Sequence, residues 1–491
     1  MELIWKETDL TRLILTASEQ ISIGGELPSP DGRRAASVLI SGAKVTITEA
    51  AAEQDAVRIS GMISVNVIAQ SEDGEAFSYV SGADFTHVLE AKGAAPGMTA
   101  LADTRVQTLS VTPSDAGAKL EAGVDISVKV ISSVPLRTVG GVSGLDDIEM
   151  KTVSCERARR VKVGSASLRL REELAGEGVA DVIWSNGFAT VRDISPDQGG
   201  STVSGVMCVS AVTVDGAGNL GQIVRQIPFR EHLNLPSEGD VICEAETQSV
   251  YVRALGEDFE ILSMEAEVSF TVSRIEKGEI LLPADAFSPS LGFDCLYEDV
   301  RIYNETGACT EQLSLKETIP LPENAAEPDS PAMIGARPIV TSLDEECGVP
   351  TVSGVLVTEV VYRSASGRLT VFTEDVPFSA AITGIKASEL STVRADCVAS
   401  AVGMGERSFQ IQYNLKLTVW EAEALDESAA VGLAERESVE RPSGIAILFA
   451  SEGEGIFDAA KKLGVSCESV RRLNPDIAEP FAEGERLIVL R

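Results

Sequence analysis

Apolar and polar residues alternate along most of the chain, which is the pattern of β-strands with one buried face. The clearest case is the run 409–420, whose alternate apolar residues are Phe409, Ile411, Tyr413, Leu415, Leu417 and Val419. Such runs are short, are separated by Gly, Asp and Ser, and show almost no helical periodicity. The pattern therefore predicts a mainly β protein made of antiparallel β-sandwich or barrel-like domains.

A Ser-Gly pair within a strand-like segment occurs three times, at Ser60-Gly61, Ser204-Gly205 and Ser353-Gly354. The pairs are 144 and then 149 residues apart. Each is followed by a Gly-containing turn and then by a Phe segment, namely Asp84-Phe85, Pro228-Phe229 and Pro377-Phe378. A repeat of this length predicts tandem domains rather than a short-repeat solenoid. We expect three such domains, at 1–150, 151–308 and 309–422.

The pattern changes after the third copy. Residues 423–442 are rich in Glu, Ala and Ser, and we predict an acidic flexible linker there. In 443–491 the apolar spacing becomes helical over 456–463, where Gly464 is a stop signal, and Ser466 is a plausible cap for a second helix over 467–473. Short apolar runs at 445–449 and 487–490 flank them, so the order is β-α-α-β.

This last segment resembles a LysM module. The resemblance rests on Ala459 to Ser466, on Leu473-Asn474-Pro475-Asp476 and on Gly484 to Leu487. Two features depart from the family: Gly453-Glu454-Gly455-Ile456 replaces the usual entry to the first helix, and the opening strand is apolar. LysM modules commonly bind N-acetylglucosamine polymers between the loop before the first helix and the loop after the second.

The resemblance implies a binding site for a partner or a glycan on these two loops. The candidate residues are Glu452, Gly453, Glu454, Gly455, Ile456, Asn474, Pro475, Asp476 and Ile477. Because sugars favour aromatic faces and neutral groups, these acidic loops suit a protein partner better than a glycan. A purely structural cap is the third reading.

The charge balance narrows the classes of partner. The chain has 75 acidic and 41 basic residues, a formal net charge of −34. Phosphate backbones and anionic lipid surfaces repel such a chain, so we expect no nucleic acid partner and no membrane insertion. A protein with basic patches fits better, although the charge could serve solubility alone. Eight cysteines without CxxC spacing, and an N-terminal run without a signal-peptide pattern, predict a cytoplasmic protein.

No catalytic constellation is visible in the sequence. The two histidines, His87 and His232, occupy equivalent places in separate copies, so we expect them to lie far apart. The sole GxGxxG match, Gly216 to Gly221, joins two strand-like runs and predicts a hairpin turn instead of a dinucleotide site. We expect no enzyme, no metal site and no cofactor.

Three β modules followed by a LysM-like module resemble the SPOCS-domain proteins of spore-forming clostridia. The Ser-Gly strands, the Pro-Phe segments and the stretch from Leu282 to Pro289 carry this resemblance, with Asp84-Phe85 the main departure. It implies a scaffold on the mother-cell side of the forespore surface, which helps to build the spore coat by docking the ATPase of its basement layer or other coat proteins. A peptidoglycan-binding wall protein is the alternative, and a carbohydrate-processing enzyme would need a carboxylate pair that we cannot locate.

Overall fold

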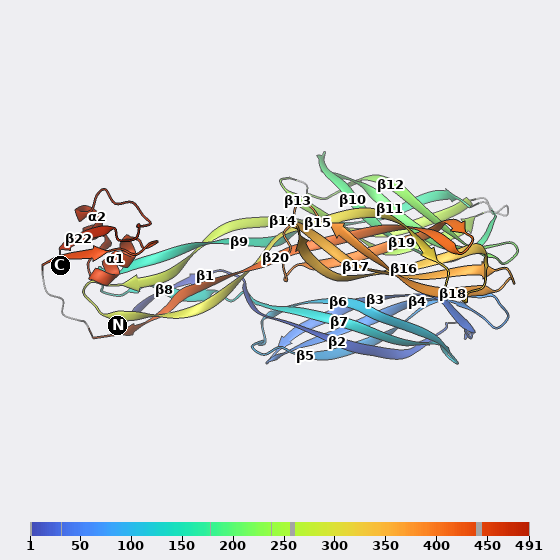
Figure 1. Ribbon diagram of the computed structural model, residues 1–491, viewed down its shortest axis with the longest axis horizontal. Coiled ribbons are helices and arrows are strands. Elements are labelled where there is room, and N and C mark those ends of the chain that lie inside the picture. Colours follow the sequence, from blue (N-terminus) through green and yellow to red (C-terminus); the bar gives the residue numbers. More distant parts are fainter. Residues whose placement is uncertain are drawn as a thin grey trace.

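The protein is elongated and mainly β, as the sequence predicts (Figure 1). The computed structural model describes residues 2–30, 32–176, 178–236, 238–255, 261–437 and 444–490. Three groups of strands, here called units 1, 2 and 3, lie together at one end of the molecule. A narrow stalk of strands extends from them, and a small C-terminal module sits at its far end.

Within the described residues each unit has six strands, which form two three-stranded antiparallel layers. Unit 1 pairs β3-β4-β5 and β2-β7-β6, unit 2 pairs β10-β11-β12 and β9-β14-β13, and unit 3 pairs β16-β17-β18 and β15-β20-β19. The strands of unit 1 are β2 (Arg12–Pro28), β3 (Ser37–Glu53), β4 (Ala56–Gln70), β5 (Ala76–Glu90), β6 (Thr99–Ser114) and β7 (Gly117–Ser132). Those of unit 2 are β9 (Glu149–Ala175), β10 (Val179–Asp197), β11 (Gly200–Asp215), β12 (Leu220–Leu233), β13 (Val241–Leu255) and β14 (Ile261–Phe287). Those of unit 3 are β15 (Phe293–Pro320), β16 (Pro328–Glu346), β17 (Val349–Ser364), β18 (Leu369–Ala381), β19 (Thr392–Gly405) and β20 (Ser408–Glu435).

Each unit has a hydrophobic core of its own, between its two layers. The alternating run of β20 behaves as its pattern predicts, because Phe409, Ile411, Tyr413, Leu415, Leu417 and Val419 are all fully buried. Single-residue bridges, Ala51 to Thr99 and Ile302 to Arg12, connect the layers of unit 1 with each other and with unit 3. Burial of one face per strand is therefore what holds each unit together.

The repeated Ser-Gly pair has the same structural role in each unit. Its glycine lies on the middle strand of a layer and pairs with the repeated phenylalanine: Gly61 with Phe85, Gly205 with Phe229 and Gly354 with Phe378. A Cβ added at Gly61 would lie 2.6 Å from the Thr46 carbonyl oxygen and 2.9 Å from the Phe85 ring. Only glycine leaves room for the ring to cover the strand at this point.

The three units close into a ring through hydrogen bonds between neighbours. Ser78 of unit 1 donates to the Ile183 carbonyl of unit 2. Gln222 of unit 2 donates to the Ile334 carbonyl of unit 3 at 3.0 Å and accepts from the Ile334 amide at 2.9 Å. Glu359 of unit 3 accepts from the Ser41 amide of unit 1 at 3.0 Å. Apolar residues from all three units, among them Ile68, Val212 and Val361, pack together in one small cluster.

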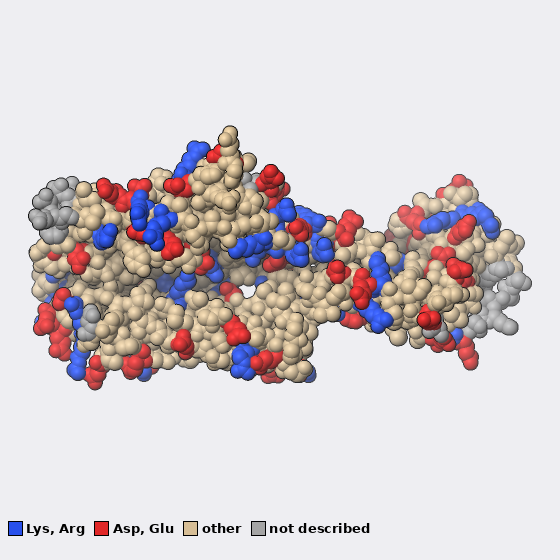
Figure 2. Space-filling model, turned by 180° about the vertical axis from the view of Figure 1, so that it is seen from behind, with Lys and Arg blue, Asp and Glu red and all other residues tan. Residues whose placement is uncertain are grey.

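A cavity of about 920 Å³ lies between the units, and charged side chains lie among the apolar and polar residues that line it. Glu246 of unit 2 lies 3.5 Å from Lys44 of unit 1 and 3.8 Å from Arg394 of unit 3, so one carboxylate faces cations from both neighbours. Figure 2 shows the surface hollowed between the units, with lysine and arginine side chains along the seam. Such ion pairs are partly exposed and are worth at most about 1 kcal/mol each.

The stalk consists of β1 (Leu3–Thr8), β8 (Leu136–Val142) and the ends of four long strands, at 149–162, 273–287, 293–305 and 422–435. Strands β9 and β14 pair along their length, as do β15 and β20, and register shifts at 272/273 and 305/307 mark where each pair leaves its unit. The predicted domain boundaries at 150/151, 308/309 and 422/423 are therefore wrong, because each falls inside a continuous strand.

The predicted flexible linker at 423–442 is wrong over 423–435, which is the end of β20. Its backbone pairs with β15 from Glu423, opposite Asn304, to Glu435, opposite Phe293. The small residues Ala429 and Ala430 are fully buried in the stalk, so an alanine-rich composition here reflects close packing between strands. Residues 438–442 of the predicted linker lie outside the described residues.

The C-terminal module contains β21 (Ile445–Phe449), α1 (Ile456–Leu463), α2 (Cys467–Leu473) and β22 (Arg486–Leu490), in that order. Its α1 stops at Gly464 in the left-handed conformation, with φ 66°, and the Ser466 side chain accepts from the Ser469 amide at the start of α2. Both helix signals read from the sequence are therefore confirmed. Among the described helices, none is long and apolar enough to cross a membrane.

Candidate functional site

The loop before α1 lies against residues 479–481, which follow the second predicted loop. The Gly453 amide donates to the Phe481 carbonyl at 3.0 Å, and the Phe481 amide donates to the Glu454 carbonyl at 2.7 Å. The Glu479 carboxylate accepts from the Ile456 amide at 2.6 Å, at the first turn of α1. The loop before α1 is thus bound tightly to the segment that follows the second predicted loop.

The predicted residues of the first loop are largely engaged within the module. Glu454 pairs with Lys462, and this hydrogen bond lowers the pKa of the Glu454 carboxyl. Gly455 is the N-cap of α1, and its amide donates to Asp458 at 3.0 Å. Ile456 is buried, whereas Glu452 is exposed and its amide donates to Glu483 at 2.9 Å.

The predicted residues of the second loop differ in their surroundings. The Asn474 side chain donates to the Ile488 carbonyl at 2.8 Å and accepts from the Ile488 amide at 2.9 Å, so it covers the outer edge of β22. Ile477 packs against the core of the module. Pro475 and Asp476 are exposed.

The geometry is unfavourable for a glycan groove between the loops. Glu479 places a carboxylate over the start of α1, 2.6 Å from where a Cβ on Gly455 would be. A shallow depression does exist nearby, but its lining is Glu452, Gly453, Glu454, Asp458, Lys461 and Lys462, all from one side. None of the residues 474–477 lines it. A charged hollow of this kind lacks the aromatic face on which a sugar ring would stack.

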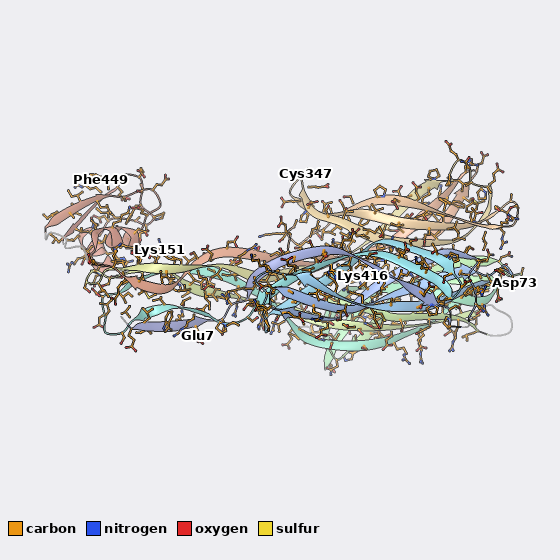
Figure 3. The ribbon with its side chains drawn as sticks, turned by 90° about the horizontal axis from the view of Figure 1, so that it is seen from below. Glu7, Asp73, Lys151, Cys347, Lys416 and Phe449 are labelled. Carbon is orange, nitrogen blue, oxygen red and sulfur yellow. The ribbon has the colours of Figure 1, made fainter. Side chains whose placement is uncertain are left out.

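The side of α1 that faces away from the core of the module contacts the stalk. Lys461 donates to Asp285 at 2.6 Å, and Lys151 lies 3.0 Å from Asp458. Phe457 meets Phe287 edge to face, with ring centroids 5.1 Å apart. Burial alone would raise the pKa of Asp285, but its hydrogen bonds from Lys461 and Tyr297 lower it. Figure 3 shows Lys151 at the end of the stalk beside the module.

The opposite side of the module has an apolar surface that sequence reasoning missed. Ile445, Ile447 and Phe449 of β21 have exposed fractions of 73, 53 and 66%, and Leu490 and Ile488 of β22 stand opposite the first two. We call these five side chains the apolar face. Phe449 points away from the stalk (Figure 3). The apolar run at 445–449 was visible in the sequence, but an all-apolar run does not show which of its side chains face solvent and which face the core.

The residues considered for catalysis are dispersed. His87 lies 2.9 Å from Glu19 and His232 lies 3.5 Å from Asp197, on equivalent strands of different units. The GxGxxG segment is the hairpin turn between β11 and β12, as predicted, and Asp215 accepts from the Ala217 and Asn219 amides there. Across the described part of the chain, no group of three or more His, Cys, Asp or Glu side chains could hold a metal ion.

Comparison with known families supports one part of the sequence prediction. Residues 35–114 match the family model described as SipL, SPOCS domain. This segment contains β3, β4 and β5 with the first Ser-Gly pair, so the predicted SPOCS resemblance is confirmed here. No curated protein and no solved structure matches the chain. The SPOCS domain indicates a sporulation-related role, and the LysM resemblance of the last segment stays a prediction.

Proposed function

We propose, on the premise that residues 35–114 are a SPOCS domain, that this chain is a non-enzymatic scaffold in assembly of the spore coat or envelope. In this proposal the three units are tandem SPOCS-like domains and residues 444–490 form a LysM-like docking module. Its partner is a coat morphogenetic protein, in the first place the basement-layer ATPase. The scaffold then works in the mother-cell cytoplasm, at the forespore surface.

The apolar face is the observation that carries the docking role. Five large apolar side chains gather on one side of a small sheet, and Phe449 among them points away from the stalk (Figure 3). Exposing them to water costs the free chain about 25 cal/mol per Å² of apolar surface, a cost that is recovered when a partner covers them. Apolar surface at a protruding end of a molecule with net charge −34 is the usual sign of a protein interaction site.

The stalk supports a scaffold rather than a freely tethered module. Phe287 at the end of β14 is 5% exposed and belongs to the core of the module. The Glu149 carboxylate accepts from the Cys467 amide at 3.1 Å at the start of α2. These contacts hold the module in a fixed orientation, so that a bound partner lies at a defined distance from the units.

Binding to peptidoglycan, the alternative function, receives no support from the loops. Glu479 fills the space over the start of α1, and the neighbouring hollow is charged. Neutral hydroxyl and acetamido groups would have to displace these internal hydrogen bonds, each worth about 1 kcal/mol or more when made to a charged group.

The proposal is tested by capture of the purified basement-layer ATPase with three forms of the chain. These are the full chain, the chain ending at residue 437, and the Val88→Asp variant as control. Val88 is 48% exposed on β5, far from the module, so it matches the apolar face in exposure. We expect the truncated chain to lose capture and the control to keep it. Unchanged capture by the truncated chain would refute the docking role.

A further inference from the structure

The backbone of β21 has an open edge that coincides with the apolar face. In an antiparallel pair, opposite residues either exchange both backbone hydrogen bonds or turn both away from each other. Ile488 turns its amide and carbonyl to Asn474, on the outer side of β22. Its partner Ile447 must therefore direct its own amide and carbonyl away from β22, toward the open edge of β21.

The same alternation applies to the whole strand. Ile445 and Phe449 stand two residues either side of Ile447, so their backbone groups face the open edge as well. The three residues with outward backbone groups are thus the three with exposed apolar side chains. Among the residues that the structure describes, no hydrogen bond is formed by the backbone groups of Ile445, Ile447 or Phe449 toward this edge. The other edge of the sheet is closed by Asn474 at Ile488.

From this arrangement we infer that the partner docks as an added β-strand on the open edge of β21. The inference rests on the proposed function and specifies its binding mode. The bound segment is extended, pairs its backbone with Ile445, Ile447 and Phe449, and places alternate apolar side chains on the apolar face. Arg486 stands opposite Phe449 at one end of this face, and an acidic residue at that end of the segment would complement its charge.

A single substitution separates the strand edge from the sheet itself. Ile447→Pro removes the amide that faces the edge, but it removes no hydrogen bond between β21 and β22, and proline is tolerated on an edge strand. Ile447→Val keeps both the amide and an apolar branched side chain, and is the matched control. Circular dichroism of each purified full-length variant checks that the module is folded.

The assay measures affinity of the full-length variants for the purified ATPase. We expect Ile447→Pro to weaken binding roughly tenfold, as the loss of one interface hydrogen bond implies, and Ile447→Val to bind within about threefold of wild type. In the complex, residue-resolved hydrogen exchange is expected to slow at the amides of Ile447 and Phe449 more than at that of Leu448, which already pairs with β22. This second measurement decides the matter if the proline variant is unfolded.

The outcomes distinguish the inference from the proposed function. If the chain ending at residue 437 binds as well as wild type, the proposed function fails. If that truncation abolishes binding while Ile447→Pro binds normally, only the strand addition is refuted. Exchange that slows on α2 and not on β21 refutes it as well. If the purified chain is a dimer that Ile447→Pro dissociates, a second copy occupies the edge and the inference is overturned.

Discussion

Gly61, the glycine of the first Ser-Gly pair, gives the most direct test of the fold, through the variant Gly61→Ala. Its Cβ would lie 2.6 Å from the Thr46 carbonyl oxygen and 2.9 Å from two atoms of the Phe85 ring, well inside normal contact. Overpacking of this kind costs about 1–3 kcal/mol, and a backbone oxygen cannot move aside as a side chain can. Replacing glycine also lowers the conformational entropy of the unfolded chain, which stabilises the folded protein by roughly 0.4–1 kcal/mol. We therefore expect a net loss of about 2 kcal/mol.

Calorimetry and urea unfolding measure this loss, and hydrogen exchange locates it. For a unit of this size the change corresponds to a fall in Tm of roughly 5–10 °C, with faster exchange confined to β3, β4 and β5. Gly42→Ala is the matched control, because Gly42 lies on the neighbouring strand β3 and a Cβ there meets nothing within 4 Å. The reasoning is refuted if Gly61→Ala is as stable as wild type, or if both variants lose the same stability.

Three further variants test the contacts between parts of the molecule. Burial raises the pKa of Glu359 from 4.5 to about 6, so the folded protein binds this proton more tightly than the unfolded chain does. The free energy of unfolding of wild type should therefore fall by up to about 2 kcal/mol as pH rises from 4.5 through 6. Glu359→Gln should lack this fall, so between pH 4.5 and 7 its free energy of unfolding, measured in urea, should rise relative to that of wild type. An equal pH dependence of the two proteins would contradict this. Gln222→Leu leaves the Ile334 amide and carbonyl without their partner, which should cost about 1–3 kcal/mol and speed hydrogen exchange in β16 but not in β4. Phe287→Ala should cost roughly 3–4 kcal/mol at the contact of stalk and module and raise the radius of gyration in X-ray scattering, while Leu281→Ala, half exposed on the same strand, should not.

The strands of the units could be predicted because their pattern has one dominant cause, burial of a single face. The run 409–420 alternates cleanly and is buried as its pattern requires. The Ser-Gly pairs could likewise be recognised as repeats, since each glycine is fixed by the same phenylalanine contact. Local spacing carried this information without any knowledge of the neighbouring units.

The stalk could not be predicted, because its strands are stabilised by partners far away in the sequence. Residues 423–435 look like a solvated linker, and they form a strand because residues 293–305 lie beside them. The candidate site was incompletely predicted for the same reason. Glu479 was missed because only the fold brings it to the Ile456 amide, 23 residues away in the chain. The apolar face was missed because the run 445–449 is apolar throughout, so its pattern does not show which side of the strand pair lacks a covering layer.

The unbroken passage of four strands from the unit cores into the stalk restricts how the arm can change in length. Each strand residue advances about 3.3 Å and turns to the opposite face. Inserting one residue in both strands of a pair would expose Ile280 and Leu282, which are now buried, and would bury Glu279 and Leu281, which are now exposed. Matched insertions of two residues keep every side chain on its face. The length of the stalk can therefore change only in increments of two residues, roughly 6–7 Å.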